Sequence, residues 1–255
     1  MRKQRVMIGF PHGGEVLGKF TESLVNLVRF EMAHPADDYE LVKIEGVGSV
    51  YVEDNRNDLV EIAQKEGVDW LFQIDTDESF KTDLLRIIMR TAHPLSRPFV
   101  VGLYANTAST PDGEFMVVDH IFGETPNGDY MPARVPDDMR PFRVDAAGTG
   151  VFLTHMSMYE RITPPWYWLQ KIRLASGKVQ TVNEDIAFCR IAREHGYEIW
   201  CDPLAEVVHW KRVPLVSSNM RRFLQSAWDA AALMERGKAR DSTKMVVGSP
   251  IRNAA

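Results

Sequence analysis

Apolar and polar positions alternate along the first part of the chain in a way that predicts strands followed by helices. The first part of the chain contains four short apolar runs. Each of the first three is followed by a longer segment in which apolar residues recur three or four positions apart. The runs lie at residues 6–10, 41–44, 70–74 and 99–103, and the helical segments lie at 17–28, from about Asn57 or Asp58, and at 84–88. This order predicts an α/β fold with a mostly parallel central sheet and helices on both faces.

The pattern changes after residue 105. Residues 105–141 are rich in Pro, Gly and Asp and predict an irregular hairpin and loop insertion. The later elements expected are a strand over 142–154 interrupted at Ala-Ala-Gly-Thr-Gly, an aromatic loop at 164–168, a helix from the capping residue Asn183 to about His195 with Gly196 as its stop, a strand at 207–210 and an amphipathic helix at 219–236. The 219–236 helix is the candidate contact for a homodimer.

Composition and charge narrow the class of protein. With 255 residues, 45% hydrophobic and 25% charged, the chain can bury one large α/β core or two small ones. The net charge of −5 and the lack of a long Lys or Arg run predict no nucleic-acid partner. Two cysteines, Cys189 and Cys201, are too few for a disulfide framework, which favours a cytoplasmic protein. No apolar run is long enough to predict a membrane span.

Two carboxylates follow the third apolar run. Asp75 and Asp77 come directly after residues 70–74, and ligands of open α/β sheets bind beyond the carboxyl ends of the strands. Hard carboxylate oxygens suit Mg²⁺ or Mn²⁺, and such a cation neutralises a diphosphate. The alternative is a solvated acidic turn before a helix near Thr82. The position directly after a buried strand favours the ligand site.

Two later features carry little information alone. Glu184 and Asp185 begin a predicted helix, where acidic side chains compensate the helix dipole. His209 ends a predicted strand beside Trp210, and a single histidine there is typical of a packed imidazole. Both features follow the Asp-x-Asp pair along the chain, and this order of three motifs says more about the protein's family than either feature alone.

This order of motifs resembles that of a GT-A glycosyltransferase of the family 2-like kind. The resemblance extends from residue 6 to about residue 211. It rests on Gly9-Phe-Pro-His-Gly-Gly-Glu15, Phe20-x-x-Ser23-Leu24, Arg56-Asn57, Ile74-Asp-Thr-Asp77 (a DXD motif), Gly148-Thr-Gly150, Glu184-Asp185 and His209. It implies a GT-A (nucleotide-diphospho-sugar transferase) fold, with residues 1–236 as a single catalytic domain and residues 237–255 as a polar tail that is a candidate for disorder.

The resemblance also implies an activity and a set of site residues. The activity is transfer of a single sugar from a UDP- or GDP-sugar to an acceptor hydroxyl, with inversion. Asp185 is the expected general base with Glu184 in support. Asp77 and His209 are the expected direct ligands of Mn²⁺ or Mg²⁺, and Asp75 is expected to contact the ribose or to reach the metal through water. The residues expected to bind the nucleotide sugar are Pro11, Glu15, Arg56, Asn57, Asp75, Thr76, Asp77 and Lys211. Those expected beside the donor or acceptor sugar are Gly148, Thr149, Gly150, Trp166 and Trp168.

Several of these residues have ordinary structural alternatives. Arg56 is equally compatible with an exposed helix start, and Lys211 with a solvent-facing side chain. The glycines at 148 and 150 are also typical of a strand bulge. The tryptophans at 164–168 could instead pin that loop to the core.

Two other classes of protein compete with the transferase. In a haloacid-dehalogenase-like phosphatase, Asp75 would attack phosphorus and Asp77 would move a proton. Such enzymes keep the pair on the first strand with Thr or Val where Ser79 stands, and no later Gly-Asp pair is found. A non-catalytic sugar-nucleotide or glycan-binding domain requires that Asp185 serve only the helix. The lack of a Gln-x-x-Arg-Trp signature favours single-sugar transfer over polymer synthesis.

Overall fold

The computed structural model describes residues 2–109, 115–173, 177 and 179–211. The chain divides into two compact units, one of residues 1–106 and 117–211 and the other of residues 107–116 and 212–255. The predicted 219–236 helix, its homodimer contact and the 237–255 tail lie outside the described residues.

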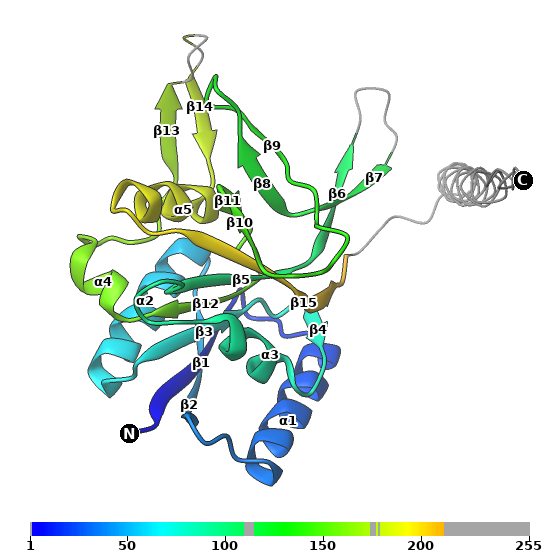
Figure 1. Cartoon of the computed structure of the whole chain (residues 1–255), viewed down its shortest axis with the longest axis vertical. Coiled ribbons are helices and arrows are strands. Elements are labelled where there is room, and N and C mark those ends of the chain that lie inside the picture. The colour runs from blue at the N-terminus through cyan, green and yellow to red at the C-terminus, as the bar shows by residue number, and fades with distance from the viewer. Residues whose placement is uncertain (1, 110–114, 174–176, 178, 212–255) are drawn as a thin grey trace, which may run out of the picture. The chain divides into compact units, whose positions relative to one another are not determined.

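The first unit is built on an eight-stranded sheet with the order β10-β15-β5-β12-β3-β1-β2, to which β4 adds by pairing with β15 (Figure 1). The strands that run in one direction are β1 (Gln4–His12), β2 (Tyr39–Gly48), β3 (Trp70–Ile74), β5 (Phe99–Leu103) and β15 (Ile199–His209). Those that run against their neighbours are β4 (Glu78–Phe80), β10 (Phe142–Val144) and β12 (Val151–His155). The α/β class is confirmed, and the sheet is mixed rather than purely parallel.

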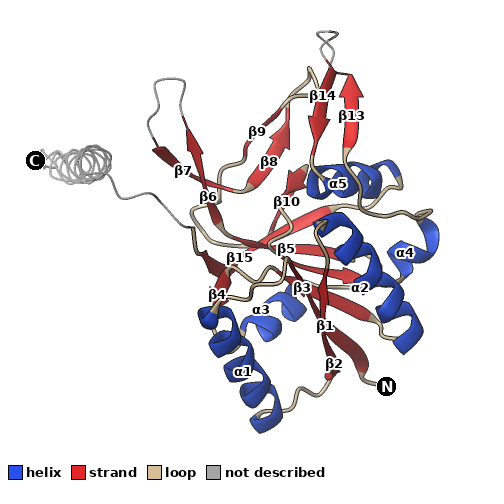
Figure 2. Cartoon of the chain, turned by 180° about the vertical axis from the view of Figure 1, so that it is seen from behind, coloured by secondary structure: helices blue, strands red, loops and turns tan. Residues whose placement is uncertain are grey.

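Helices cover both faces of this sheet (Figure 2). They are α1 (Gly18–Ala33), α2 (Val52–Glu66), α3 (Leu84–Thr91), α4 (Ser157–Arg161) and α5 (Glu184–Glu194). Side chains of β3 alternate between two core clusters, because successive residues of a strand point to opposite faces. Leu71 packs in the cluster that includes Leu59 of α2 and Phe188 of α5, and Phe72 in the one that includes Leu85 of α3.

Several element boundaries differ from the sequence prediction. α2 begins at Val52 rather than near Asn57, because its first turns bury the polar Asn55 and Arg56, which an apolar pattern cannot detect. β15 begins at Ile199 rather than at residue 207, since the strand continues through an irregular register. The Asn183 side chain makes no capping hydrogen bond to α5, whereas Gly196 follows that helix with φ of +82°, as expected of a stop.

The segment predicted as an irregular insertion contains small sheets. One pairs β6 (Ala105–Ser109) with β7 (Phe115–Asp119), and another joins β8 (Ile121–Glu124), β9 (Tyr130–Pro132) and β11 (Ala146–Ala147). A hairpin of β13 (Gln170–Arg173) and β14 (Val179–Val182) was not predicted. Since β5 ends and β12 begins at the carboxyl edge of β3, the segment between them leaves the sheet at the expected ligand edge.

The aromatic loop packs into the core. Trp166 is 4% exposed, its Nε1 donates to the Ile162 carbonyl at 2.9 Å, and its ring meets Tyr159 edge-on. The prediction that Trp166 contacts a sugar is wrong for this structure, because protein atoms enclose the indole. Trp168 is only partly buried, and its sugar contact stays a prediction.

Replacing Trp166 with alanine is expected to reduce the free energy of unfolding by ~3–5 kcal/mol, the usual cost of removing a buried aromatic ring. The matched variant Trp168→Ala removes a less buried ring and is expected to lose less. Urea denaturation of both variants measures the difference. Equal, small losses would contradict the buried position of Trp166.

Candidate functional site

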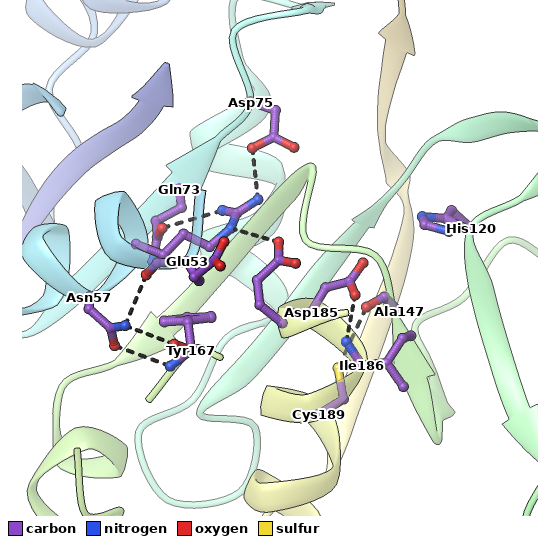
Figure 3. A network of polar contacts seen from close by, with 12 residues as sticks. Glu53, Asn57, Gln73, Asp75, His120, Ala147, Tyr167, Asp185, Ile186 and Cys189 are labelled. Carbon is purple, nitrogen blue, oxygen red and sulfur yellow. Dashed lines mark hydrogen bonds and ion pairs between the residues drawn. The ribbon is translucent and has the colours of Figure 1, made fainter. Parts of the chain in front are cut away.

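A buried guanidinium links the end of β3 to the start of α5. Arg56 is 1% exposed and projects from α2. Its Nη2 donates to Asp75 Oδ1 at 2.8 Å, and its Nε lies 3.6 Å from Glu184 Oε1 (Figure 3). Its charged group also lies over the Phe152 ring, 5.4 Å from the centroid. The alternative of an exposed helix-start arginine is therefore excluded.

The charges around Arg56 shift the protonation of the neighbouring carboxyls. Burial opposes the positive charge of Arg56, but Asp75 and Glu184 outweigh it and raise its pKa. Burial raises the pKa of Asp75 to about 6, against the attraction of Arg56. Asp185 is 8% exposed, and burial, followed by the charge of Glu184, raises its pKa to about 7. A carboxyl with a pKa near the working pH is suited to general base catalysis.

The second aspartate of the pair faces a histidine. His209 Nδ1 lies 3.1 Å from the Ala105 carbonyl oxygen, which can only accept, so Nδ1 carries a proton. His209 Nε2 then meets Asp77 Oδ2 at 3.1 Å, and either a proton or a cation must lie between these two groups. Lys211 Nζ reaches the same oxygen at 3.0 Å. Burial disfavours ionisation of Asp77, but the bonds from His209 and Lys211 prevail and lower its pKa to about 2.

Asp77 and His209 fit a divalent cation. A backbone carbonyl that fixes the Nδ1 proton is the usual orientation of a metal-binding histidine, and mixed oxygen and imidazole ligands suit Mn²⁺. Asp75, the third ligand predicted, has its Oδ1 bound by Arg56, and its contact with a cation stays a prediction. In the described part of the chain, no three His, Cys, Asp or Glu side chains are gathered in a ligand arrangement.

A cleft of about 180 Å³ lies at the carboxyl ends of the first three strands. Its lining residues are Pro11, His12, Gly13, Ser49, Val50, Val52, Asn55, Asp75, Thr76 and Asp77. Four of the predicted nucleotide-binding residues, Pro11, Asp75, Thr76 and Asp77, thus meet at one place. Sequence reasoning missed Asn55, whose buried Oδ1 has no hydrogen-bond partner among the described residues. Glu15 is exposed and does not line this cleft.

Asn57 has a structural task that the sequence prediction did not include. Its Oδ1 accepts from the backbone N–H groups of Trp166 and Tyr167 at 2.9 and 3.1 Å, and its Nδ2 donates to the Tyr167 carbonyl at 2.8 Å. Both ends of the side chain therefore hold the aromatic loop (Figure 3). The nucleotide contact predicted for Asn57 stays a prediction.

The Gly148-Thr149-Gly150 segment makes room for side chains that sequence reasoning missed. A Cβ at Gly148 would overlap the Tyr104 hydroxyl and the His120 ring, and one at Gly150 would overlap Glu78 Oε1. Glu78 is fully buried, and neither carboxyl oxygen has a hydrogen-bond partner in the described regions. Burial, followed by the charges of Asp75 and Asp77, raises its pKa well above the usual value. The sugar contact predicted for 148–150 stays a prediction.

Comparison with known proteins supports the fold. No protein-family model and no curated protein matches the chain. GalNAc-T7 crystallised with UDP, GalNAc and Mn²⁺ is similar over 83% of this chain and 44% of that one, with a TM-score of 0.55 and 11% identity. A197 from STIV is similar over 84% of this chain and 98% of that one, with a TM-score of 0.44 and 14% identity. The chain therefore has a GT-A-like fold, and nothing assigns it to family 2.

The sequence predicts no membrane span, and the helices of the structure can be compared with that prediction. Among the helices of the described residues, none combines the length and apolar character that crossing a bilayer requires.

Replacing Arg56 with methionine is expected to destabilise the fold by about 3 kcal/mol, because the carboxylates of Asp75 and Glu184 then lose their cation. Arg56→Lys keeps the positive charge but not the several N–H donors of the guanidinium, and it should lose less free energy of unfolding than Arg56→Met. Lys211→Met, which removes an exposed cation, is the control and should cost ~1 kcal/mol or less. Chemical denaturation at pH 7.5 measures all three, and an Arg56→Met loss no larger than the control would refute this arrangement.

The raised pKa of Asp185 predicts a pH-dependent effect on stability. Between about pH 4 and pH 7 the folded chain holds a proton on Asp185 that the unfolded chain releases, so this carboxyl costs stability as pH rises. Asp185→Asn should therefore gain Tm relative to the parent from pH 4 to about pH 7, and the gain should level off above that.

The exposed substitution Asp37→Asn is the matched control, for which no such gain is expected. Thermal melts across pH 4–9 measure both differences. A Tm difference for Asp185→Asn that does not change with pH would contradict a buried, desolvated carboxyl.

Proposed function

We propose that this chain is a metal-dependent glycosyltransferase that moves a single sugar from a nucleotide-diphosphate sugar to an acceptor hydroxyl, with inversion. The observation that carries the proposal is a network of charges in which Arg56 joins Asp75, at the end of β3, to Glu184, beside Asp185 at the start of α5. Through Asp75, that network reaches the edge where Asp77 meets His209. The GT-A-like fold supports the proposal, as does the UDP, GalNAc and Mn²⁺ present with GalNAc-T7.

The binding half of the site is formed by strand ends. Asp77 and His209 would hold Mn²⁺ or Mg²⁺, and the bound cation would neutralise the diphosphate and stabilise it as a leaving group. The nucleotide would occupy the cleft beside Pro11 and Thr76. Lys211, on the same Asp77 oxygen, adds a positive charge for the diphosphate.

The chemical half lies at the start of α5. Asp185 would take the proton from the acceptor hydroxyl as that oxygen bonds to the anomeric carbon. The bond from this carbon to the diphosphate breaks, and its electron pair leaves with the nucleotide. The Ile186 N–H donates to Asp185 Oδ1 at 2.7 Å and so fixes the orientation of the carboxyl. Arg56 holds Glu184 beside it.

The phosphatase has less support. Its nucleophile would be Asp75, whose Oδ1 is bound to the buried Arg56. A guanidinium on the attacking oxygen lowers its nucleophilicity and ties it to the protein. In a domain that only binds sugar nucleotides, Asp185 would serve the helix alone, whereas in the transferase it is the general base. Measuring turnover of an Asp185 variant distinguishes the two.

A screen of UDP-, GDP- and dTDP-sugars with Mn²⁺, read out as release of the product nucleotide, tests the proposed activity. At least one donor should release nucleotide at a rate that rises with pH through about 7, as Asp185 ionises. Asp185→Asn should bind that donor normally but turn over ~10²–10⁴-fold more slowly. Asp77→Ala should lose the part of the affinity that depends on metal.

Asp37→Asn is again the control and should match the parent. Parental turnover by Asp185→Asn would assign this residue to the helix alone and leave a different catalyst. Donor affinity that is the same in EDTA as in Mn²⁺ would refute the metal assignment of Asp77 and His209.

A further inference from the structure

Tyr104 and His120 form a pair whose chemistry the proposed mechanism does not use. The Tyr104 hydroxyl lies 2.5 Å from His120 Nδ1, and the two rings meet edge to face. The pair fills the space above Gly148, where a Cβ would overlap both groups. Glycine at 148 is therefore a condition for the pair to form.

The hydrogen bond between them assigns the proton on each ring. Tyr104 is 7% exposed, so the proton of its hydroxyl needs an acceptor inside the protein. If His120 Nδ1 were the donor, the hydroxyl proton would remain in buried surroundings without an acceptor, which is costly. Tyr104 is therefore the donor and Nδ1 the acceptor. Burial also lowers the pKa of His120 to about 4, so the ring is neutral and its one proton is on Nε2.

The Nε2–H group of His120 is available to a ligand. Within the described residues no protein acceptor bonds to it, and His120 is only partly buried. In Figure 3 the His120 ring is directed toward the side on which Asp185 lies. A fixed donor, supported from behind by a buried tyrosine, is suited to recognise one hydroxyl group.

The position of the pair identifies which hydroxyl. Tyr104 packs edge-on against His209, at 5.2 Å between ring centroids. The charges of Asp75 and Asp185 both act on its hydroxyl. A donor sugar must extend from the diphosphate, at Asp77 and His209, to the base at Asp185. Tyr104 and His120 therefore lie along the span that this sugar has to occupy.

We propose that His120 binds a hydroxyl of the transferred sugar through Nε2–H, and that Tyr104 positions the ring by fixing its tautomer. This inference rests on the proposed glycosyltransferase function. It assigns recognition of the sugar, as distinct from the nucleotide, to two residues from the segment after β5.

The test separates the sugar from the nucleotide. Calorimetry with Mn²⁺ compares UDP with UDP-GalNAc, and GDP with GDP-mannose, for the parent, His120→Ala, His120→Gln and Tyr104→Phe. His120→Ala should bind the free nucleotide as the parent does but the nucleotide sugar ~3–10-fold more weakly, the value of one hydrogen bond. His120→Gln, which keeps an N–H donor of similar reach, should recover most of that loss.

Tyr104→Phe removes only the hydroxyl. It should weaken binding of the nucleotide sugar by a smaller factor than His120→Ala does and leave binding of the free nucleotide unchanged. His34→Ala, at an exposed histidine on the far end of α1, is the control and should bind both probes normally. Nucleotide-sugar affinity unchanged in His120→Ala, or equal losses for nucleotide and nucleotide sugar, would overturn the inference while the transferase proposal stands. Failure of the parent to bind any of the four probes, together with no nucleotide release from any donor in the screen, would overturn both.

Discussion

A guanidinium that is enclosed by protein must have anionic partners, and this requirement sets the arrangement of the whole site. Arg56 is buried beneath the ligand edge, so its charge is stable there only if carboxylates from other elements reach it. Asp75 from the end of β3 and Glu184 from the start of α5 meet this need. The same contacts place Asp185, the neighbour of Glu184, at the edge that carries Asp77.

The charge distribution gives similar carboxyl groups different tasks. Asp75 faces Arg56 and is a structural partner, whereas Asp77 faces His209 and Lys211, and its pKa of about 2 keeps it ionised. No cation among the described residues forms an ion pair with Asp185, and burial raises its pKa to about 7. Carboxyls whose pKa values are driven apart in one site can divide the work between holding a cation and moving a proton. The aspartates two residues apart are therefore not an equivalent pair.

The sequence predicted what depends on local pattern and missed what depends on tertiary contact. The strands at 70–74 and 99–103 were predicted with their observed bounds, because fully buried strands are continuous apolar runs. Buried polar residues such as Arg56 and Glu78 have no such pattern, and neither has the partly buried His120. Trp166 was misassigned because an aromatic side chain looks the same in sequence whether it faces substrate or core. The GT-A resemblance predicted the fold, but the family 2 assignment has no support beyond the motifs.

The most direct test of this account is a crystal structure of the chain with UDP and Mn²⁺, with anomalous scattering measured at the manganese edge. The account predicts an anomalous peak bound by Asp77 and His209, with Asp75 still paired to Arg56 and the nucleotide in the cleft beside Pro11 and Thr76. A manganese peak away from this edge, or UDP bound with no metal between its diphosphate and Asp77, would contradict it.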